Sequence, residues 1–266
     1  MSRAVSRRCF LKSLSVLGLS SAFAAFPGFT APGRARLLVI GGGFGGATAA
    51  RYARRLLPQL SVTLIEPNRQ YTACPFSNLV LGGGRPMSAQ TFTYAALSAE
   101  GIEVVPQAAT DVDPAQRTVT LAGGKSLSYD RLILAPGIDF RWGALEGYTA
   151  EASTRLPHAW KAGAQTELLR DQLRAMDNGG VVAISVTAAP FRCPPGPYER
   201  ASLVAQYLQM HKPRSKLIVL DSNERFSKQP LFLQAWQRRY GDLLEWRSAS
   251  NDGRVVRVEP GSMTLH

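Results

Sequence analysis

The spacing of apolar residues predicts two strand–helix–strand units along the chain. Apolar residues run without interruption through "LLVI" and predominate again in "VTLI". The segment between them has the small and apolar residues of a packed helix. We expect a strand from Arg34, a tight turn, a helix to Leu57 and a second strand over 61–67. The same order returns with a strand over 179–186, a helix over 199–212 and a strand over 215–221.

Shorter patterns fill the region between these two units. Strands are predicted over 102–106, 117–122 and 130–137, followed by a helix over 162–176. A strand joined to the next through a helix runs parallel to it, so each unit builds a parallel sheet. We predict a boundary between the two units between Gly147 and Ala164.

The N-terminal stretch has the pattern of an export signal. Paired Arg7 and Arg8 precede an apolar run from Leu14 to Phe26, which is shorter than the ~20 residues that cross a bilayer. Arg-Arg followed by Phe, Leu and Lys resembles the twin-arginine signal, which exports folded proteins to the periplasm. An ordinary secretory signal is the alternative. We assign residues 1–33 to this signal, with cleavage after "AFA" or a few residues later, and expect no stable membrane span.

Charge excludes one large class of partner. The 266 residues carry a formal net charge of +12, and beyond the N-terminal stretch the basic residues are spread along the chain. They form neither a basic helix nor a zinc finger, and no aromatic platform interrupts them, so nucleic acid is not an expected partner. The sequence also lacks a metal-ligand cluster and a CxxCH haem-attachment motif.

The first turn carries a phosphate-binding pattern. Gly41, Gly43 and Gly46 form GxGxxG directly after a strand, where the glycines permit a tight turn, approach to a pyrophosphate and close packing of the helix. Glu66 ends the next strand, in position to bind both ribose hydroxyls of an adenosine. A glutamate there disfavours a 2′-phosphate, so FAD or NAD is expected rather than NADP. Glycines that serve only a turn are the alternative.

A later segment favours FAD over NAD. "YDRLILAPG" ends a strand in the short loop Ala135, Pro136 and Gly137, and it resembles the second FAD-binding segment of disulfide-reductase-like flavoproteins. The fold class we predict is therefore α/β, with two Rossmann-like βαβ domains of that type. The first half of an FAD-binding domain spans 34–155, and a second domain spans 156–266 and is incomplete at the C-terminus.

Two cysteines remain once the signal with Cys9 is removed. They are Cys74, in "YTACPFSN", and Cys193, in "APFRCPPGPYER", which stands where a second nucleotide loop is expected. A disulfide between them, or a merely buried Cys74, is an open alternative. Cys193 lies beside Arg192, just before a helix predicted to begin near Tyr198 or Glu199. A positive local field there favours a thiolate, and the adjacent prolines stiffen the loop.

From the glycine loop onward the chain resembles the flavoprotein subunit of flavocytochrome c sulfide dehydrogenase. The resemblance rests on "GGGFGGATAA", "VTLIEPN", "YTACPFSN", "YDRLILAPG", "LPHAWKAG" and "APFRCPPGPYERAS". It implies FAD bonded covalently to the sulfur of Cys74, and Cys193 as half of a redox-active disulfide beside the flavin. It also implies Glu199 as proton acceptor, although an acid at a helix start explains Glu199 equally well. For His158 and Trp160 we expect packing.

The same resemblance implies a reaction and a partner. Hydrogen sulfide is the expected substrate, and electrons leave to a separate c-type cytochrome subunit that alone carries haem c. The chain resembles a truncated form of that subunit, because the family's later flavin segment, second redox cysteine and cytochrome-docking region do not appear. The alternatives are a sulfide:quinone oxidoreductase, which delivers electrons to membrane quinone, and a catalytically inactive nucleotide-binding fragment.

Overall fold

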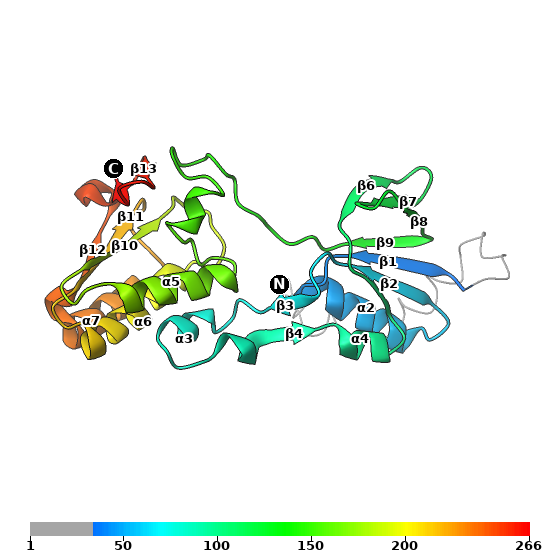
Figure 1. The fold of residues 1–266 in the computed structure, drawn as a ribbon, viewed down its shortest axis with the longest axis horizontal. Coiled ribbons are helices and arrows are strands. Elements are labelled where there is room, and N and C mark those ends of the chain that lie inside the picture. The colour runs from blue at the N-terminus through cyan, green and yellow to red at the C-terminus, as the bar shows by residue number, and fades with distance from the viewer. Residues whose placement is uncertain (1–33) are drawn as a thin grey trace, which may run out of the picture.

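The computed structural model describes residues 34–266 and arranges them in two lobes (Figure 1). The predicted export signal over 1–33 lies outside the described residues. Each lobe contains one parallel sheet flanked by helices, which confirms the predicted α/β class. In the part that the structure describes, no helix is long and apolar enough to cross a membrane.

The sheet of the first lobe has the strand order β5-β2-β1-β9, with every neighbouring pair parallel. Its faces are covered differently because alternate residues of β1 point to opposite sides. Leu37 and Val39 pack in a cluster with Ala50 of helix α2, whereas Leu38 packs with Val119 of an antiparallel three-stranded meander. The elements are β1 (Arg36–Ile40), α2 (Phe44–Leu56), β2 (Ser61–Ile65), α4 (Ala95–Ala99), β5 (Glu103–Val105), β6 (Ala109–Asp113), β7 (Thr118–Leu121), β8 (Ser126–Ser128) and β9 (Arg131–Leu134).

The second lobe has a smaller parallel sheet in the order β10-β11-β12. Its core gathers apolar residues of the sheet and of helix α6 around Tyr198 and Trp236, both almost fully buried. Helix α6 begins at Gly196, two or three residues before the predicted start at Tyr198 or Glu199. Prolines stand at 194, 195 and 197, and the helix can start among them because proline suits a first helical turn. The elements are α5 (Ala164–Ala175), β10 (Val181–Val186), α6 (Gly196–His211), β11 (Lys216–Asp221), α7 (Gln229–Arg239) and β12 (Leu244–Arg247).

An excursion between β2 and α4 reaches from one lobe to the other. It consists of the hairpin β3 (Gln70–Thr72) and β4 (Thr91–Thr93) with the short helix α3 (Ser77–Leu81) at its far end. Helix α3 packs against α5 and α6, as Figure 1 shows. The chain ends in a small hairpin, β13 (Val258–Glu259) and β14 (Thr264–Leu265). The predicted boundary stays a prediction, since this excursion ties the two lobes together.

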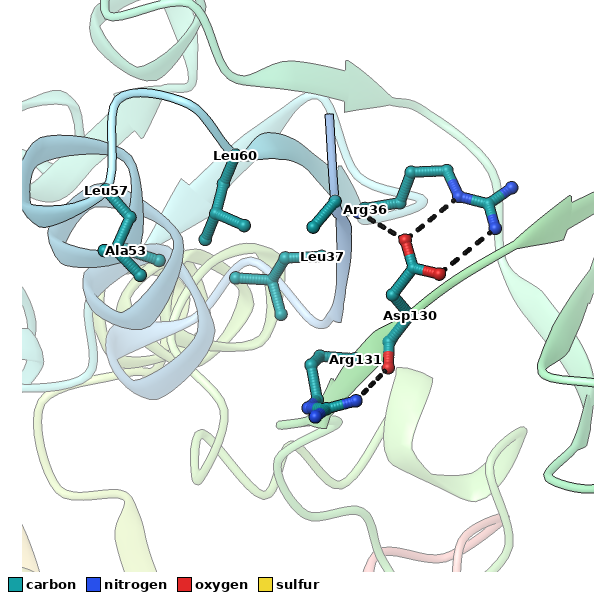
Figure 2. Close-up of a pocket in the computed structure, with 8 residues that line it drawn as sticks. Arg36, Leu37, Ala53, Leu57, Leu60, Asp130 and Arg131 are labelled. Carbon is teal, nitrogen blue, oxygen red and sulfur yellow. Dashed lines mark hydrogen bonds and ion pairs between the residues drawn. The ribbon is translucent and has the colours of Figure 1, made fainter. Parts of the chain in front are cut away.

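A hollow in the first lobe lies at the amino ends of the strands (Figure 2). Leu37, Leu57 and Leu60 line it, and an ion pair between Arg36 and Asp130 closes one side at 3.3 Å. The Arg36 guanidinium and backbone N–H lower the pKa of Asp130. Ligands of parallel α/β sheets bind at the carboxyl ends, so this hollow is at the wrong end of the sheet for a cofactor.

Candidate functional site

The glycine loop lies at the carboxyl end of β1, between that strand and α2. Gly41 has a φ of +101°, and a Cβ on it would lie 2.0 Å from the carbonyl oxygen of Ala135. A Cβ on Gly46 would lie 1.8 Å from the carbonyl oxygen of Gly41. Both positions therefore exclude any side chain, which brings α2 and the Ala135 loop close to the strand end.

The amino end of α2 is open to an anion. Gly43 is its N-cap and provides no side-chain hydrogen bond, and the first turn contains no acidic residue. The first N–H groups of a helix have no partner within the helix, and the helix dipole adds positive potential there. A Cβ on Gly43 would meet nothing closer than a ring carbon of Tyr71 at 3.6 Å. This end of the helix fits a pyrophosphate.

Glu66 lies at the end of β2 beside the same loop. Its Oε2 accepts a hydrogen bond from the N–H of Gly42 at 2.8 Å, and its Oε1 accepts from the backbone and side chain of Asn68 at 2.9 and 2.7 Å. The carboxylate is only partly buried and keeps acceptor positions for ribose hydroxyls. Asn68 was not singled out from the sequence, although an Asn two residues after an acid is a common turn residue.

Tyr94 contacts the glycine loop and was also missed by sequence reasoning. Its hydroxyl donates to the carbonyl of Gly42 at 3.2 Å. Burial, and then the charge of Glu66, raise the pKa of Tyr94 to about 12, so it stays a donor. Tyr94 follows a hairpin strand that sequence patterns did not predict, so no local signal pointed to it.

Ala135, Pro136 and Gly137 follow β9 at the same edge of the sheet. The N–H of Ala135 donates to the carbonyl of Ile40 at 2.8 Å, and Gly137 has a φ of +79°. Exposed apolar side chains adjoin them, with Leu134 62% and Ile138 53% exposed. The glycine loop, Glu66 and the loop from Ala135 to Gly137 therefore meet at the carboxyl ends of the strands, whereas Cys74 lies elsewhere.

Cys74 follows β3 and lies where the lobes meet. Its Sγ is 3.6 Å from the carbonyl oxygen of Trp160, and the Nη2 of Arg192 donates to that sulfur at 3.3 Å and to the same carbonyl at 2.8 Å. Arg192, which we expected to act on the neighbouring Cys193, thus lies within hydrogen-bonding distance of Cys74. The link back to the glycine loop is Tyr71, whose ring packs edge-on against Phe44 at 5.4 Å.

Cys193 is an exposed free thiol in the loop before α6. Its φ of +60° lies in the left-handed region, which non-glycine residues seldom adopt, and its carbonyl accepts from the N–H of Gly196 at 2.8 Å. The Sγ packs 3.1 Å from where a Cβ on Gly196 would be, with the Trp160 ring close by. Cys74 is likewise free, so the structure contains no disulfide between the two.

Glu199 lies in the first turn of α6, where an acid suits the helix dipole. Its side chain is exposed and makes no hydrogen bond or ion pair with the rest of residues 34–266. The carboxylate therefore faces solvent at the start of the helix.

Arg200 is a buried cation that sequence reasoning missed. It is 8% exposed, and its guanidinium donates to the carbonyls of His158 and Ala159 at 3.1 and 2.8 Å and to Oδ1 of Asn78 at 3.2 Å. It also lies 5.4 Å from the centre of the Trp160 ring. Burial lowers its pKa to about 10, while the nearby Cys193 and Cys74 act in the opposite direction. A signal existed, since Arg200 precedes Val204 and Leu208 at helical spacing on the apolar face.

Trp160, for which we expected packing, contacts several residues around the two cysteines. Its carbonyl meets Cys74 and Arg192, and its ring meets Arg200. His158 holds this segment in place, accepting at Nδ1 from the N–H of Trp160 at 3.0 Å and stacking on Phe140 at 4.1 Å. Residues 34–266 contain no group of three or more His, Cys, Asp or Glu placed to hold a metal ion.

Two family models match the chain. Residues 35–183 match the family model for pyridine nucleotide-disulphide oxidoreductases, and residues 166–266 match that for the central part of the sulfide dehydrogenase (flavocytochrome c) flavoprotein chain. The sulfide dehydrogenase flavoprotein chain of Chlorobaculum thiosulfatiphilum is 56% identical over 48 residues, which are 18% of this chain and the whole of that sequence.

Sulfide-quinone reductases are also similar. That of Aquifex aeolicus is 34% identical over 109 residues, covering 41% of this chain and 25% of the reductase. The solved sulfide:quinone oxidoreductase of the same bacterium superposes with a TM-score of 0.65 at 23% identity, over 87% of this chain and 56% of that one. The chain thus spans about half the length of this structural relative, and the likeness shows the fold.

Proposed function

Since the chain belongs to the pyridine nucleotide-disulphide oxidoreductase family, and within it resembles the flavoprotein chains of flavocytochrome c sulfide dehydrogenase, we propose that it oxidises hydrogen sulfide with FAD and passes the electrons to a c-type cytochrome subunit. One observation carries the proposal: a loop with the exposed thiol of Cys193 replaces the second nucleotide loop, and it meets the segment of Cys74 at Trp160.

FAD fits the first lobe through the chain's own groups. The open amino end of α2, with Gly41, Gly43 and Gly46, would hold the pyrophosphate, and Glu66 would hold the ribose. Ala135, Pro136 and Gly137 would border the cofactor at the adjacent strand end. When bound, FAD supplies a two-electron acceptor that can release electrons one at a time.

Cys74 would hold the cofactor covalently through its sulfur. Its position after β3, joined to the glycine loop by Tyr71, supports this role. Arg192 donates to the sulfur and fixes its direction. A tether of this kind would retain the cofactor in the periplasm, the compartment we propose from the twin-arginine pattern.

Cys193 would enter the reaction as half of a disulfide whose other cysteine lies outside residues 34–266. Hydrosulfide attacks the Sγ of Cys193, the disulfide bond breaks, a persulfide forms on Cys193, and the partner cysteine leaves as a thiolate. The two electrons of the sulfide are then available to the flavin. Glu199, exposed at the helix start, would accept the proton that the hydrosulfide releases.

Transfer to quinone is the second candidate, favoured by the 34% identity with the Aquifex sulfide-quinone reductase. The twin-arginine pattern and the match of residues 166–266 support the cytochrome-linked reaction instead. The identity of the electron acceptor, quinone or c-type cytochrome, distinguishes the two candidate functions.

Anaerobic titration tests the proposal on purified protein reconstituted with FAD. In a form of the protein that also contains the cysteine proposed to pair with Cys193, sulfide should bleach the flavin absorbance. Micromolar NADH or NADPH should not bleach it. Bleaching by NADH would instead assign a pyridine-nucleotide reductase. In the same form, faster reoxidation by a c-type cytochrome than by a soluble quinone supports the first candidate, and the reverse order supports the second.

A further inference from the structure

The two βαβ units end in matching acid and amide pairs. Glu66 closes β2, and both the N–H and the side-chain amide of Asn68 donate to it. Asp221 closes β11, and the N–H and side-chain amide of Asn223 donate to its Oδ1 at 3.0 and 2.8 Å. In a nucleotide-binding unit, the acid at this place binds ribose. Asp221 therefore occupies the ribose position of the second unit.

Asp221 differs from Glu66 in having no free acceptor. It is 0% exposed, and its Oδ2 accepts from the hydroxyl of Tyr198 at 2.7 Å and from Nε1 of Trp246 at 2.9 Å. Tyr198 is itself 0% exposed and stacks on Phe226 at 3.7 Å. Burial, and then the bond to Asp221, raise the pKa of Tyr198, which keeps it a donor. A ribose therefore has no access to this carboxylate.

Asp221 and Asn223 hold the chain on both sides of Cys193. Before the cysteine, the Nδ2 of Asn223 donates to the carbonyl of Thr187 and its Oδ1 accepts from the N–H of Ala189, both at 2.9 Å. After the cysteine, Tyr198 fixes the first turn of α6 to Asp221. Every hydrogen-bonding group of the Asn223 amide is used.

We propose that Asp221 and Asn223 are positioning residues for Cys193: together they anchor the two ends of the loop over 187–198 and fix where the sulfur of Cys193 points. The inference rests on the proposed role of Cys193. The left-handed φ of Cys193 needs such support, because a strained backbone persists only when its surroundings hold it. The carboxylate of Asp221 cannot bind a ribose while its oxygens accept hydrogen bonds from Tyr198, Trp246 and Asn223.

The test measures the loop without requiring sulfide oxidation. In the full chain, Asn223→Ala and Tyr198→Phe are compared with wild type by hydrogen–deuterium exchange and by iodoacetamide labelling, with each cysteine quantified by peptide mass spectrometry. We expect amides of 187–197 to exchange at least tenfold faster and Cys193 to label at least threefold faster than in wild type, because its sulfur leaves its packing against Gly196. The protein is prepared without FAD, so that the proposed tether of Cys74 does not form. Labelling of Cys193 is normalised to the same protein unfolded in urea rather than to Cys74, because Arg192 of the same loop contacts the Cys74 sulfur.

Matched controls separate positioning from general destabilisation. Asn178→Ala removes an amide that accepts from the N–H of Arg214 at the opposite end of β10 and β11, and Tyr240→Phe removes a hydroxyl that donates to Ser202 in α6. Both should leave the labelling rate of Cys193 unchanged. Wild-type values in Asn223→Ala and Tyr198→Phe, or exchange rising equally throughout β10, β11 and α6, would overturn the inference. Because no sulfide is used, failure of the proposed reaction would appear separately in the flavin titration.

Discussion

Cys74 can be tested as a single sulfur atom. We expect Cys74→Ser to bind FAD without a covalent bond, since serine occupies the same place but its hydroxyl is a far weaker nucleophile than a thiolate. Acid precipitation of the reconstituted protein measures this directly: flavin should stay with the wild-type pellet and move to the supernatant in the variant. Flavin that remains attached to Cys74→Ser but not to Cys193→Ser would place the tether on the other cysteine.

His158 gives the molecule a defined response to acid. Burial, and then the charges of Arg200 and Lys161, lower its pKa from 6.5 to about 4. Protonation would also break the bond in which its Nδ1 accepts from Trp160. The unfolded chain therefore takes up the proton first, so His158 contributes stability above about pH 6.5 that is lost as the pH falls towards 4.

Urea unfolding of wild type and His158→Gln at pH 7.5 and 4.5 measures this contribution. Between the two pH values, wild type should lose about 2–3 kcal/mol more than the variant, since each pKa unit is worth about 1.4 kcal/mol. If wild type and His158→Gln lose the same free energy of unfolding between pH 7.5 and 4.5, another group is responsible for the loss.

At the scale of elements, Arg200 joins α6 to α3 and to the segment before α5. Arg200→Met keeps much of the side-chain volume but leaves two carbonyls and Asn78 without their donor. We expect the free energy of unfolding in urea to fall by about 2–4 kcal/mol, because buried acceptors lose their partner. Arg238→Met, at an exposed position of α7, should stay within about 0.5 kcal/mol of wild type. A similarly small effect of Arg200→Met would refute the structural role.

At the scale of the whole molecule, the proposed reaction depends on the number of cysteines. Cys74 and Cys193 are the cysteines of residues 34–266, and the proposal commits Cys74 to the flavin. Cys193 then has no disulfide partner among these residues for hydrosulfide to attack. We expect residues 34–266, reconstituted with FAD, to show no steady reduction of cytochrome c with sulfide above a no-protein control. Sustained reduction would show that a second redox cysteine is unnecessary.

The sequence by itself determined the two βαβ units and the glycine loop with Glu66. These features are local, because strand periodicity, a glycine turn and an acid at a strand end are set by neighbouring residues. The positions of Cys74 and Cys193 in unusual motifs were also visible, and the motifs indicated the family that the comparisons support.

Only the tertiary structure decided how these parts meet. The hairpin β3–β4 and helix α3 are too short to give a periodic signal, yet they carry Cys74 to the second lobe. The contacts of Arg192 with Cys74 and of Asp221 with Tyr198 join residues 118 and 23 positions apart. The partner of a charged group depends on which surfaces pack together. Burial decides whether an acid keeps free acceptor positions, as Glu66 does, or has its oxygens occupied by other side chains, as Asp221 does.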